Sequence, residues 1–395
     1  MKRRIAPLRD FLANESASGI ILMVAAVLGM LAANLPTSES YYRILDISFT
    51  IDFPGIFISM TILKLINYGL MTLFFFVVGL EIKREISSGH LSRLRQAAAP
   101  FFAAAGGMAV PALIYLLIAG DVAPEGWAIP VATDIALAVG VLALMGSRVT
   151  QGLKAFLLAL AVIDDIGAIL IIAIVYSAGV QVSWLFGGLL SVIAVLFLQK
   201  LDVTNRFTYL LVGLLLWYSL YKAGLHPTLA GVIMGLLAPA TPAKAGEKED
   251  VEDGELTVVE ELEHQFHSLS SLIVVPIFAF ANAGVPLSYD AARDAISSPI
   301  AWGIILGLVL GKPIGVFATS KLVSRAGLAE LPEGATNKAL IATGSTAGIG
   351  FTVAIFIAKL AFDAGAVQDL AVTAVIVGSI LSGVLSLILF RIGER

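Results

Sequence analysis

The 395-residue chain contains no cysteine, and few of its residues are charged. Without cysteine it can form neither a disulfide nor a thiolate-ligated metal site, and the redox state of its compartment is left open. Asp, Glu, Lys and Arg make up 14% of the residues, whereas about a quarter of a typical soluble protein is charged. The apolar fraction of 58% and the mean hydropathy of +0.93 indicate an integral membrane protein.

The apolar residues occur in blocks of about 20, the length of a membrane-spanning helix, whereas a membrane barrel shows alternating strands of roughly 10 residues. We therefore expect an all-α polytopic membrane protein, with one transmembrane domain over residues 1–395 because no block has soluble composition. The basic N-terminus and first apolar run indicate a retained helix rather than a signal peptide. Twelve spans are predicted, at 16–35, 62–81, 97–119, 127–146, 153–176, 182–199, 207–222, 226–239, 267–285, 300–320, 339–360 and 368–390.

The distribution of Lys and Arg predicts the orientation of these spans. An even number of spans places both termini on one side of the membrane. The tails and alternate loops on that side carry 19 of the 25 Lys and Arg residues, and the opposite loops carry five. Because basic residues concentrate in cytoplasmic loops, both termini are expected in the cytoplasm.

Two loops have a character of their own. From Leu45 to Phe53 every odd position is apolar and every even position polar, and Pro54-Gly55 follows as a turn. This pattern predicts an extracytoplasmic β-hairpin over residues 45–59, with an ordinary loop as the alternative. Residues 240–263 are acidic and polar, which is typical of a solvated cytoplasmic linker.

Charged residues lie inside the apolar spans. Asp134, Asp164, Asp165 and Lys312 fall near mid-span, and Lys359 falls closer to a span end. A charge at the bilayer centre costs about 2.5–3.5 kcal/mol on insertion scales. Interhelical ion pairs that fix the packing would explain one Asp–Lys pair, but two acids would be left over. The set therefore favours an ion pathway.

The adjacent acids Asp164 and Asp165 cannot share one role. Successive helical residues point about 100° apart. One carboxylate can face a cavity while its neighbour meets another helix. We expect one of them to be a cation ligand and the other to be the partner of Lys312.

Two spans contain helix-breaking residues. Pro130 precedes Asp134 by four residues and removes a helical hydrogen bond, while Gly344, Gly348 and Gly350 interrupt the eleventh span. Interrupted spans at corresponding positions of two halves point to a binding site at the bilayer midplane. Spans 3–5 and 10–12 would then be inverted-topology repeats, with breaks in spans 4 and 11.

The motifs VATDIALAVG, LAVIDDIGA, LEHQFH, FAFANAGV, GKPIGV and GIGFT follow one another along the chain. With them the sequence resembles the bacterial NhaA sodium/proton antiporters over nearly its whole length. NhaA is itself one of the transporters on which the rule of inverted repeats rests, so that rule is not independent of the resemblance. The resemblance implies an electrogenic, multi-pass inner-membrane exchanger that expels Na⁺ or Li⁺ and admits more protons, serving salt tolerance and pH homeostasis.

The same resemblance implies roles for individual residues. Asp165 would be the main ion ligand, Asp164 would contribute and pair with Lys312, and Thr133 would support the ion. Asp134 and Lys312 would balance the facing ends of the broken helices. A carboxylate must lose its proton to bind Na⁺, so the two ions compete for one site. Whether Asp164 or Lys312 carries the second proton is left open.

The few histidines raise the question of regulation. His264 and His267 lie three residues apart at the start of span 9, beside Glu263, and an interfacial polar patch would explain them. The resemblance instead implies a pH-sensing cluster of Glu81, Arg84, Glu85, Glu263, His264 and His267. No HExxH motif is present, and HxxH without a third ligand is weak, so no resident metal or other cofactor is expected. A pH role for His226 is a weaker prediction.

Some positions depart from the family pattern. SLSS follows His267 where a Pro-Trp pair is typical, so the pH set-point is expected to differ. Lys359 stands where a small or polar residue is usual, and either snorkels to the outer interface or alters the exit path. The hairpin resembles the family's dimerisation element. The expected partners are therefore the lipid bilayer and a second copy of the chain, and not nucleic acid.

Three other functions also use acids within membrane helices. A sodium-coupled symporter needs a pocket for an organic substrate, whereas the polar residues within these spans are almost entirely carboxylates, hydroxyls and one amine. A cation channel would lack proton coupling. An intramembrane aspartyl protease would need a GxGD motif, which is absent, and aspartates on different helices.

Overall fold

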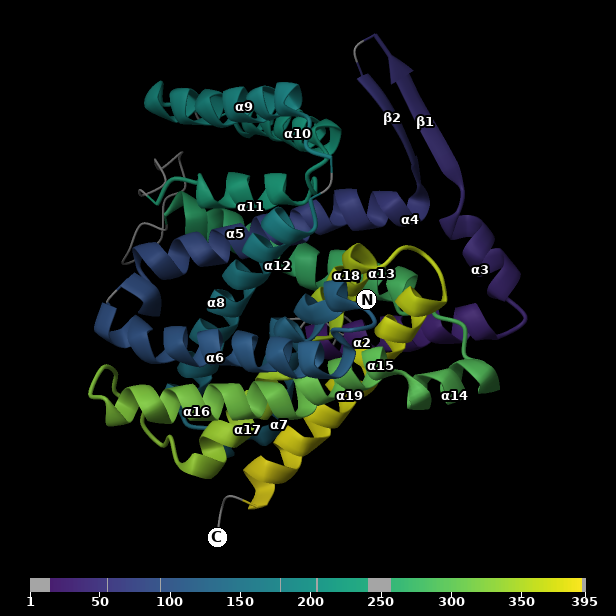
Figure 1. Ribbon diagram of the computed structural model, residues 1–395. Coiled ribbons are helices and arrows are strands. Elements are labelled where there is room, and N and C mark those ends of the chain that lie inside the picture. Colours follow the sequence, from purple (N-terminus) through teal and green to yellow (C-terminus); the bar gives the residue numbers. More distant parts are fainter. Residues whose placement is uncertain are drawn as a thin grey trace, which may run out of the picture. The chain divides into compact units, whose positions relative to one another are not determined.

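The computed structural model describes residues 15–54, 56–92, 94–177, 179–203, 205–240 and 257–392. Helices make up most of this part of the chain, with one two-stranded sheet (Figure 1). The chain divides into two compact units. The first unit comprises Met1–Phe49, Arg93–Ala168 and Pro276–Arg395, and the second comprises Thr50–Ser92 and Ile169–Val275.

The first unit is built from helices that come from both ends of the chain. Its elements are α2 (Glu15–Asn34), α3 (Ser38–Leu45), α6 (Leu94–Ala119), the 3-10 segments η4 (Pro124–Val131) and η5 (Gly146–Arg148), α7 (Ile135–Met145), α14 (Tyr289–Ser297), α15 (Pro299–Leu306), the π-helical η7 (Gly307–Gly311), α16 (Lys312–Arg325), α17 (Asn337–Ala347), α18 (Phe351–Ala361) and α19 (Ala366–Ile392). The helix α8 (Gln151–Val175) begins in this unit, and α13 (Val275–Asn282) belongs almost entirely to it.

The second unit carries the hairpin and the remaining helices. Its elements are β1 (Ser48–Phe53), β2 (Ile56–Thr61), α4 (Ile62–Leu65), the π-helical η2 (Ile66–Leu70), α5 (Met71–Ser87), the 3-10 segment η3 (His90–Ser92), α9 (Val182–Lys200), α10 (Arg206–Ala223), α11 (Leu229–Leu236), α12 (Val258–Leu269) and the π-helical η6 (Ser270–Val274).

Each of the twelve predicted spans overlaps at least one helix. Among the described residues, nine helices are long and apolar enough to cross a membrane, or ten if the bent pair α17–α18 counts as one span. The helices α10 and α11 are not among them. The eight residues of α11 span about 12 Å, less than half of a hydrocarbon core about 30 Å thick. Twelve spans and inverted repeats remain predictions.

The hairpin is present, but it begins later than its sequence pattern predicted. Leu45 is the last residue of α3, where it is buried on the same face as Tyr41. The Tyr41 hydroxyl donates to the Phe280 carbonyl at 2.8 Å. Leu45, where the pattern begins, is therefore the end of an amphipathic helix, and residues 46 and 47 join that helix to the first strand. The strands run from 48 to 53 and from 56 to 61.

The predicted acidic linker lies mostly outside the described residues, which resume at 257. The helix α12 begins at Val258, so the end of the predicted linker is helical. A capping box starts this helix: Thr257 Oγ1 accepts from the Glu260 N–H, and the Glu260 carboxylate accepts from the Thr257 N–H. These reciprocal bonds satisfy two backbone donors that a helix start leaves open.

Two helices of the first unit, α6 and α16, lie side by side (Figure 1). A Cβ atom on Gly315 of α16 would lie 2.1 Å from the Gly106 carbonyl oxygen of α6, so no larger residue fits there. Small residues at such crossings allow membrane helices to approach closely. This contact holds the first turns of α16, which carry Lys312.

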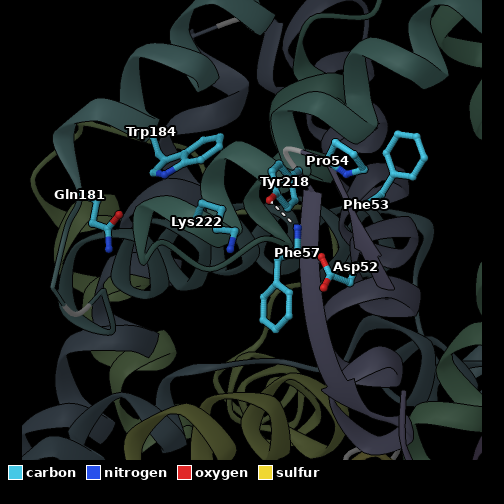
Figure 2. Close-up of a pocket in the computed structure, with 8 residues that line it drawn as sticks. All are labelled: Asp52, Phe53, Pro54, Phe57, Gln181, Trp184, Tyr218 and Lys222. Atoms are coloured by element: carbon cyan, nitrogen blue, oxygen red, sulfur yellow. Dashed lines mark hydrogen bonds between the residues drawn. The ribbon is translucent and has the colours of Figure 1, made fainter. Parts of the chain in front are cut away.

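The hairpin of the second unit contacts the end of α10. The Phe57 N–H donates to the Tyr218 hydroxyl at 3.1 Å, and the Lys222 ammonium lies 5.6 Å from the Phe57 ring centre (Figure 2). A cavity of about 460 Å³ lies at this contact, lined by Asp52, Phe53, Pro54, Phe57, Gln181, Trp184, Tyr218 and Lys222. One hydrogen bond and one cation–π contact therefore fix β2 to α10.

Candidate functional site

The two interruptions lie near Pro130 and at Gly348–Gly350, and they meet in space, whereas Gly344, which was also predicted to interrupt its span, lies within α17. After η4, residues 132 to 134 continue without helical structure before α7 begins at Ile135. The helices α17 and α18 are separated at Gly348–Gly350 and are bent by 50°. The Asp134 N–H donates to the Ile349 carbonyl at 2.6 Å, so the two breaks are joined directly.

Asp134 lies at this junction, with 2% of its surface exposed. Its Oδ1 accepts from the Leu137 N–H at 3.1 Å, in the first turn of α7. Its Oδ2 accepts from Thr352, from the N–H at 3.0 Å and from the hydroxyl at 2.6 Å, at the start of α18. The starts of both helices carry partial positive charge and open N–H groups. One carboxylate therefore caps two half-helices.

Lys312, Asp164 and Thr133 form a second group, and none of the three is exposed to solvent. The Lys312 ammonium pairs with Asp164 Oδ2 and donates to Thr133 Oγ1 at 2.9 Å. Thr133 Oγ1 lies 2.7 Å from Asp164 Oδ2 and 2.9 Å from the Ala347 carbonyl, at the end of α17. Because a hydroxyl has one hydrogen, Thr133 donates to only one of these acceptors at a time.

The second oxygen of Asp164 has no hydrogen-bond donor within the described part of the chain. This Oδ1 atom is buried, which is costly for a carboxylate oxygen that lacks a donor or a cation. Asp165 follows on α8 and is also buried. Asp164 pairs with Lys312 through one oxygen, and its other oxygen is left open.

The described residues hold no group of three or more His, Cys, Asp and Glu side chains arranged to bind a metal ion. Instead, the Asp164 carboxylate contacts the Thr133 hydroxyl, which also contacts the Ala347 backbone carbonyl. A hard monovalent cation accepts such a mixed set, as the unwound helices of transporters illustrate.

Sequence reasoning missed two parts of this site. Thr352 belongs to the motif GIGFT, in which the sequence predicted a role, as helix breakers, only for the glycines. The π-helical segment η7 ends at Gly311, directly before Lys312, and no local sequence pattern predicts it. A π-helical turn is rare and is frequent at functional sites. A hydroxyl beside a helix break was the available signal for Thr352.

Lys359 lies near the end of α18 and is only partly exposed. The opposite charge that acts on it comes from Asp369, in the first turn of α19. Gln368, the residue before Asp369, donates to the Phe362 carbonyl at 2.6 Å. The Gln368–Phe362 hydrogen bond therefore holds the α18–α19 turn.

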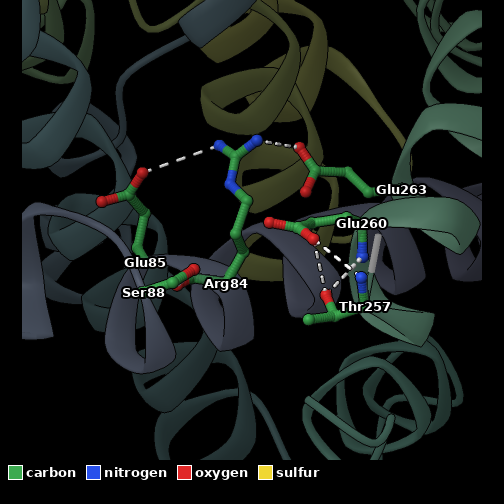
Figure 3. A network of polar contacts seen from close by, with 6 residues as sticks. All are labelled: Arg84, Glu85, Ser88, Thr257, Glu260 and Glu263. Carbon is green, nitrogen blue, oxygen red and sulfur yellow. Dashed lines mark hydrogen bonds and ion pairs between the residues drawn. The ribbon is translucent and has the colours of Figure 1, made fainter. Parts of the chain in front are cut away.

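In the second unit, α5 and α12 bring part of the predicted pH-sensing cluster together. Arg84 Nη1 lies 2.8 Å from Glu263 Oε1, and Arg84 Nη2 lies 3.6 Å from Glu85 Oε1 (Figure 3). The Glu81 carboxyl group interacts electrostatically with Arg84, Glu85 and Glu263. Figure 3 shows the capping box of α12 beside this network.

The two histidines of the predicted cluster differ from Glu263 in exposure. His264 and His267 are exposed, whereas Glu263 is buried. A positive charge on His264 would interact electrostatically with the Glu263 carboxylate. His226 is buried elsewhere in the second unit, with Nδ1 2.9 Å from Thr228 Oγ1 and its ring edge-on to Tyr68.

Comparison with known proteins places this arrangement in a family. Residues 9–390 match the family described as Na⁺/H⁺ antiporter 1. A protein of Shewanella amazonensis named Na(+)/H(+) antiporter NhaA is 44% identical over 397 residues, which cover 98% of this chain and 99% of that relative. Relatives of the same name from Bordetella parapertussis and Aeromonas hydrophila are 45% and 42% identical, each over 98% of this chain and 96% of the relative.

These matches confirm the resemblance that the motifs indicated, and they cover both breaks and every residue of the Asp164 group. The same matches exclude a protease or another enzyme as the class of this protein. The chain belongs to the Na⁺/H⁺ antiporter 1 family and is a secondary transporter.

Proposed function

We propose that the protein exchanges cytoplasmic Na⁺ or Li⁺ for external protons, with more than one proton admitted per ion. The observation that carries this proposal is the open, buried oxygen of Asp164 at the crossing of two broken helices, beside a buried lysine. The transported ions are substrates and not resident cofactors. The names of the relatives support Na⁺/H⁺ exchange.

The ion site comprises Asp164, Asp165 and Thr133, with Asp165 as the main ligand. A cation that binds Asp164 competes with the Lys312 ammonium and with a proton for the same carboxylate. Release of Lys312 from Asp164 frees both oxygens for the incoming ion. If the empty, ionised site cannot reorient, ion and proton must cross in opposite directions, which couples their gradients.

The charge balance follows from the same group. When Na⁺ binds, protons leave the two carboxylates or Lys312. With two protons exchanged for one ion, each cycle moves net charge across the membrane. Asp134 compensates the positive starts of α7 and α18 throughout the cycle, and it is supported in that role by its hydrogen bonds to Leu137 and Thr352.

A second part of the proposal concerns regulation by pH. The cluster of Glu81, Arg84, Glu85, Glu263, His264 and His267 gathers acidic, basic and imidazole groups on α5 and α12. Protonation of its acids or imidazoles changes the charge that surrounds Arg84. We propose that this charge change turns transport on as the pH rises.

Orientation and assembly complete the proposal. Both termini face the cytoplasm, because basic residues favour that side. Two copies pair through the hairpin of β1 and β2 while each copy transports on its own. Removal of residues 48–61 would then give monomers in a sizing experiment that still exchange ions, whereas dimers without the hairpin would contradict this assembly.

The test is transport in sealed vesicles with an imposed pH gradient and a fluorescent pH probe. Na⁺ and Li⁺ are expected to dissipate the gradient with the wild type and not with Asp165→Asn. Asp363→Asn, the same change at an exposed residue, is the matched control and should transport normally. A gradient that persists with the wild type from pH 6 to pH 9 would contradict antiport.

The same vesicles test the charge balance. Valinomycin with K⁺ collapses the membrane potential that net charge movement creates. Electrogenic exchange is expected to speed up when valinomycin is added. Equal rates with and without valinomycin would show that one proton moves per ion.

A further inference from the structure

Three serines of α19 face the break between α17 and α18. Ser379, Ser382 and Ser386 are all buried. Their spacing of three and four residues places them on one face of the helix. We call these three residues the serine ladder.

The outer members of the ladder hold the two sides of the break. Ser379 Oγ accepts from the Phe351 N–H at 3.1 Å, at the first residue of α18. Ser386 Oγ lies 2.6 Å from Thr346 Oγ1, in the last turn of α17. A serine in a membrane helix commonly bonds a carbonyl of its own preceding turn. These two bond the neighbouring segment instead.

The middle member lies against the break itself. A Cβ atom on Gly348 would lie 2.8 Å from Ser382 Oγ and 2.4 Å from the Leu308 carbonyl oxygen of η7. The Gly348 backbone is therefore packed between α19 on one side and the π-helical turn before Lys312 on the other. No side chain at 348 fits between them.

The Ser379–Phe351 contact lies next to the contact between Asp134 and Thr352. An α-helix start leaves several N–H groups without a helical acceptor. At the start of α18, the Phe351 N–H goes to Ser379, and the Thr352 N–H goes to the Asp134 carboxylate. Two consecutive donors are thus held by two different elements. Asp134 in turn follows Thr133, which contacts Asp164.

We propose that Ser379 is a positioning residue that fixes the start of α18 and thereby sets the affinity of the Asp164 site for Na⁺. The positioning rests on the geometry alone, and its effect on Na⁺ rests on the proposed function. Loss of the Ser379 hydroxyl leaves a buried N–H without its acceptor. The start of α18 then loosens, and the Thr352–Asp134 contact shifts with it.

The first arm of the test measures positioning without any ion. Amide hydrogen exchange is followed in the full-length protein in detergent, over the peptide that contains residues 348 to 356. Ser379→Ala is expected to speed exchange there about tenfold. Ser320→Ala is the matched control. Ser320 is equally buried, on α16, and its hydroxyl has no hydrogen-bond partner within the described residues.

The second arm measures the KM for Na⁺ in vesicles. Ser379→Ala is expected to raise KM about tenfold with a smaller change in the maximal rate. Ser379→Thr keeps the hydroxyl and should restore KM, and Ser379→Cys, a weak acceptor, should be intermediate. The cysteine variant also serves if the alanine variant does not fold.

The outcomes separate this proposal from the proposed function. Unchanged exchange in the 348–356 peptide of Ser379→Ala would overturn the positioning role, whatever the transport data show. Faster exchange with an unchanged KM would overturn its link to affinity. Faster exchange in a protein whose wild type moves no Na⁺ would support positioning and contradict antiport.

Discussion

The Asp134 carboxylate accepts two hydrogen bonds from Thr352, one from its N–H at 3.0 Å and one from its hydroxyl at 2.6 Å. The two residues lie 218 positions apart in the sequence, on opposite sides of the crossing. This contact ties one interrupted span to the other. A movement of α18 relative to α7 would therefore have to break these two hydrogen bonds.

Asp134→Asn should destabilise the protein by about 2 kcal/mol, because a hydrogen bond to a charged group contributes about 1.5–3 kcal/mol. The amide keeps one acceptor but turns an NH₂ group toward an N–H donor. The apparent melting temperature in detergent measures the effect. Asp363→Asn at an exposed position is the control, and equal melting of Asp134→Asn and wild type would contradict the double-cap role.

Lys312→Met should cost about 3–5 kcal/mol, since it leaves the buried Asp164 carboxylate without its cation. The double variant Lys312→Met, Asp164→Asn removes both charges and should recover most of the lost stability. Thermal unfolding of the two single variants and the double variant provides the measurement. Lys338→Met, at an exposed residue, controls for the substitution. Additive losses in the double variant would argue against a coupled pair.

Gly315→Ala should separate α6 from α16, because its new methyl group would lie 2.1 Å from the Gly106 carbonyl oxygen. We expect a lower melting temperature and weaker Na⁺ transport, since Lys312 lies one turn away on α16. Gly140→Ala is the matched control, because a Cβ atom there meets no atom within 4 Å. Similar behaviour of the two variants would show that the crossing tolerates a methyl group.

Arg84→Ala should move the pH profile of transport toward alkaline pH. The change removes a positive charge from beside Glu85 and Glu263, which favours the protonated form of the acidic cluster. Transport rates in vesicles from pH 6 to pH 9 give the profile. Arg206→Ala removes another arginine that pairs with a glutamate of α12, Glu261 at 2.6 Å. This control should not shift the pH profile of transport. A common shift in both variants would indicate a general charge effect.

Much of the fold could be predicted because its signals are local. Hydropathy located the helices, and Pro130 and the glycines near 348 located both breaks. The strand alternation located the hairpin but began it too early, because the alternation starts at Leu45, the last residue of α3, and includes the two residues that join α3 to the strand. The π-helical turn before Lys312 could not be predicted, since it depends on how η7 packs against its neighbours.

The candidate site, like the fold, could be predicted only in part from the sequence. The cost of burying charge singled out Asp134, Asp164, Asp165 and Lys312 from the sequence alone. The residues themselves left open which adjacent acid meets Lys312, and the family resemblance favoured Asp164. The structure pairs Lys312 with Asp164 over a sequence separation of 148 residues.

By itself, therefore, the sequence determined the class of protein, the positions of the helices and of their breaks, and the set of buried charges. These follow from hydropathy, backbone restrictions and the cost of burying charge, which act within a few residues. Only the tertiary structure decided the partners: Asp164 for Lys312, Thr352 for Asp134 and Ser379 for Phe351. Those contacts depend on how separate helices cross, and no local pattern records that.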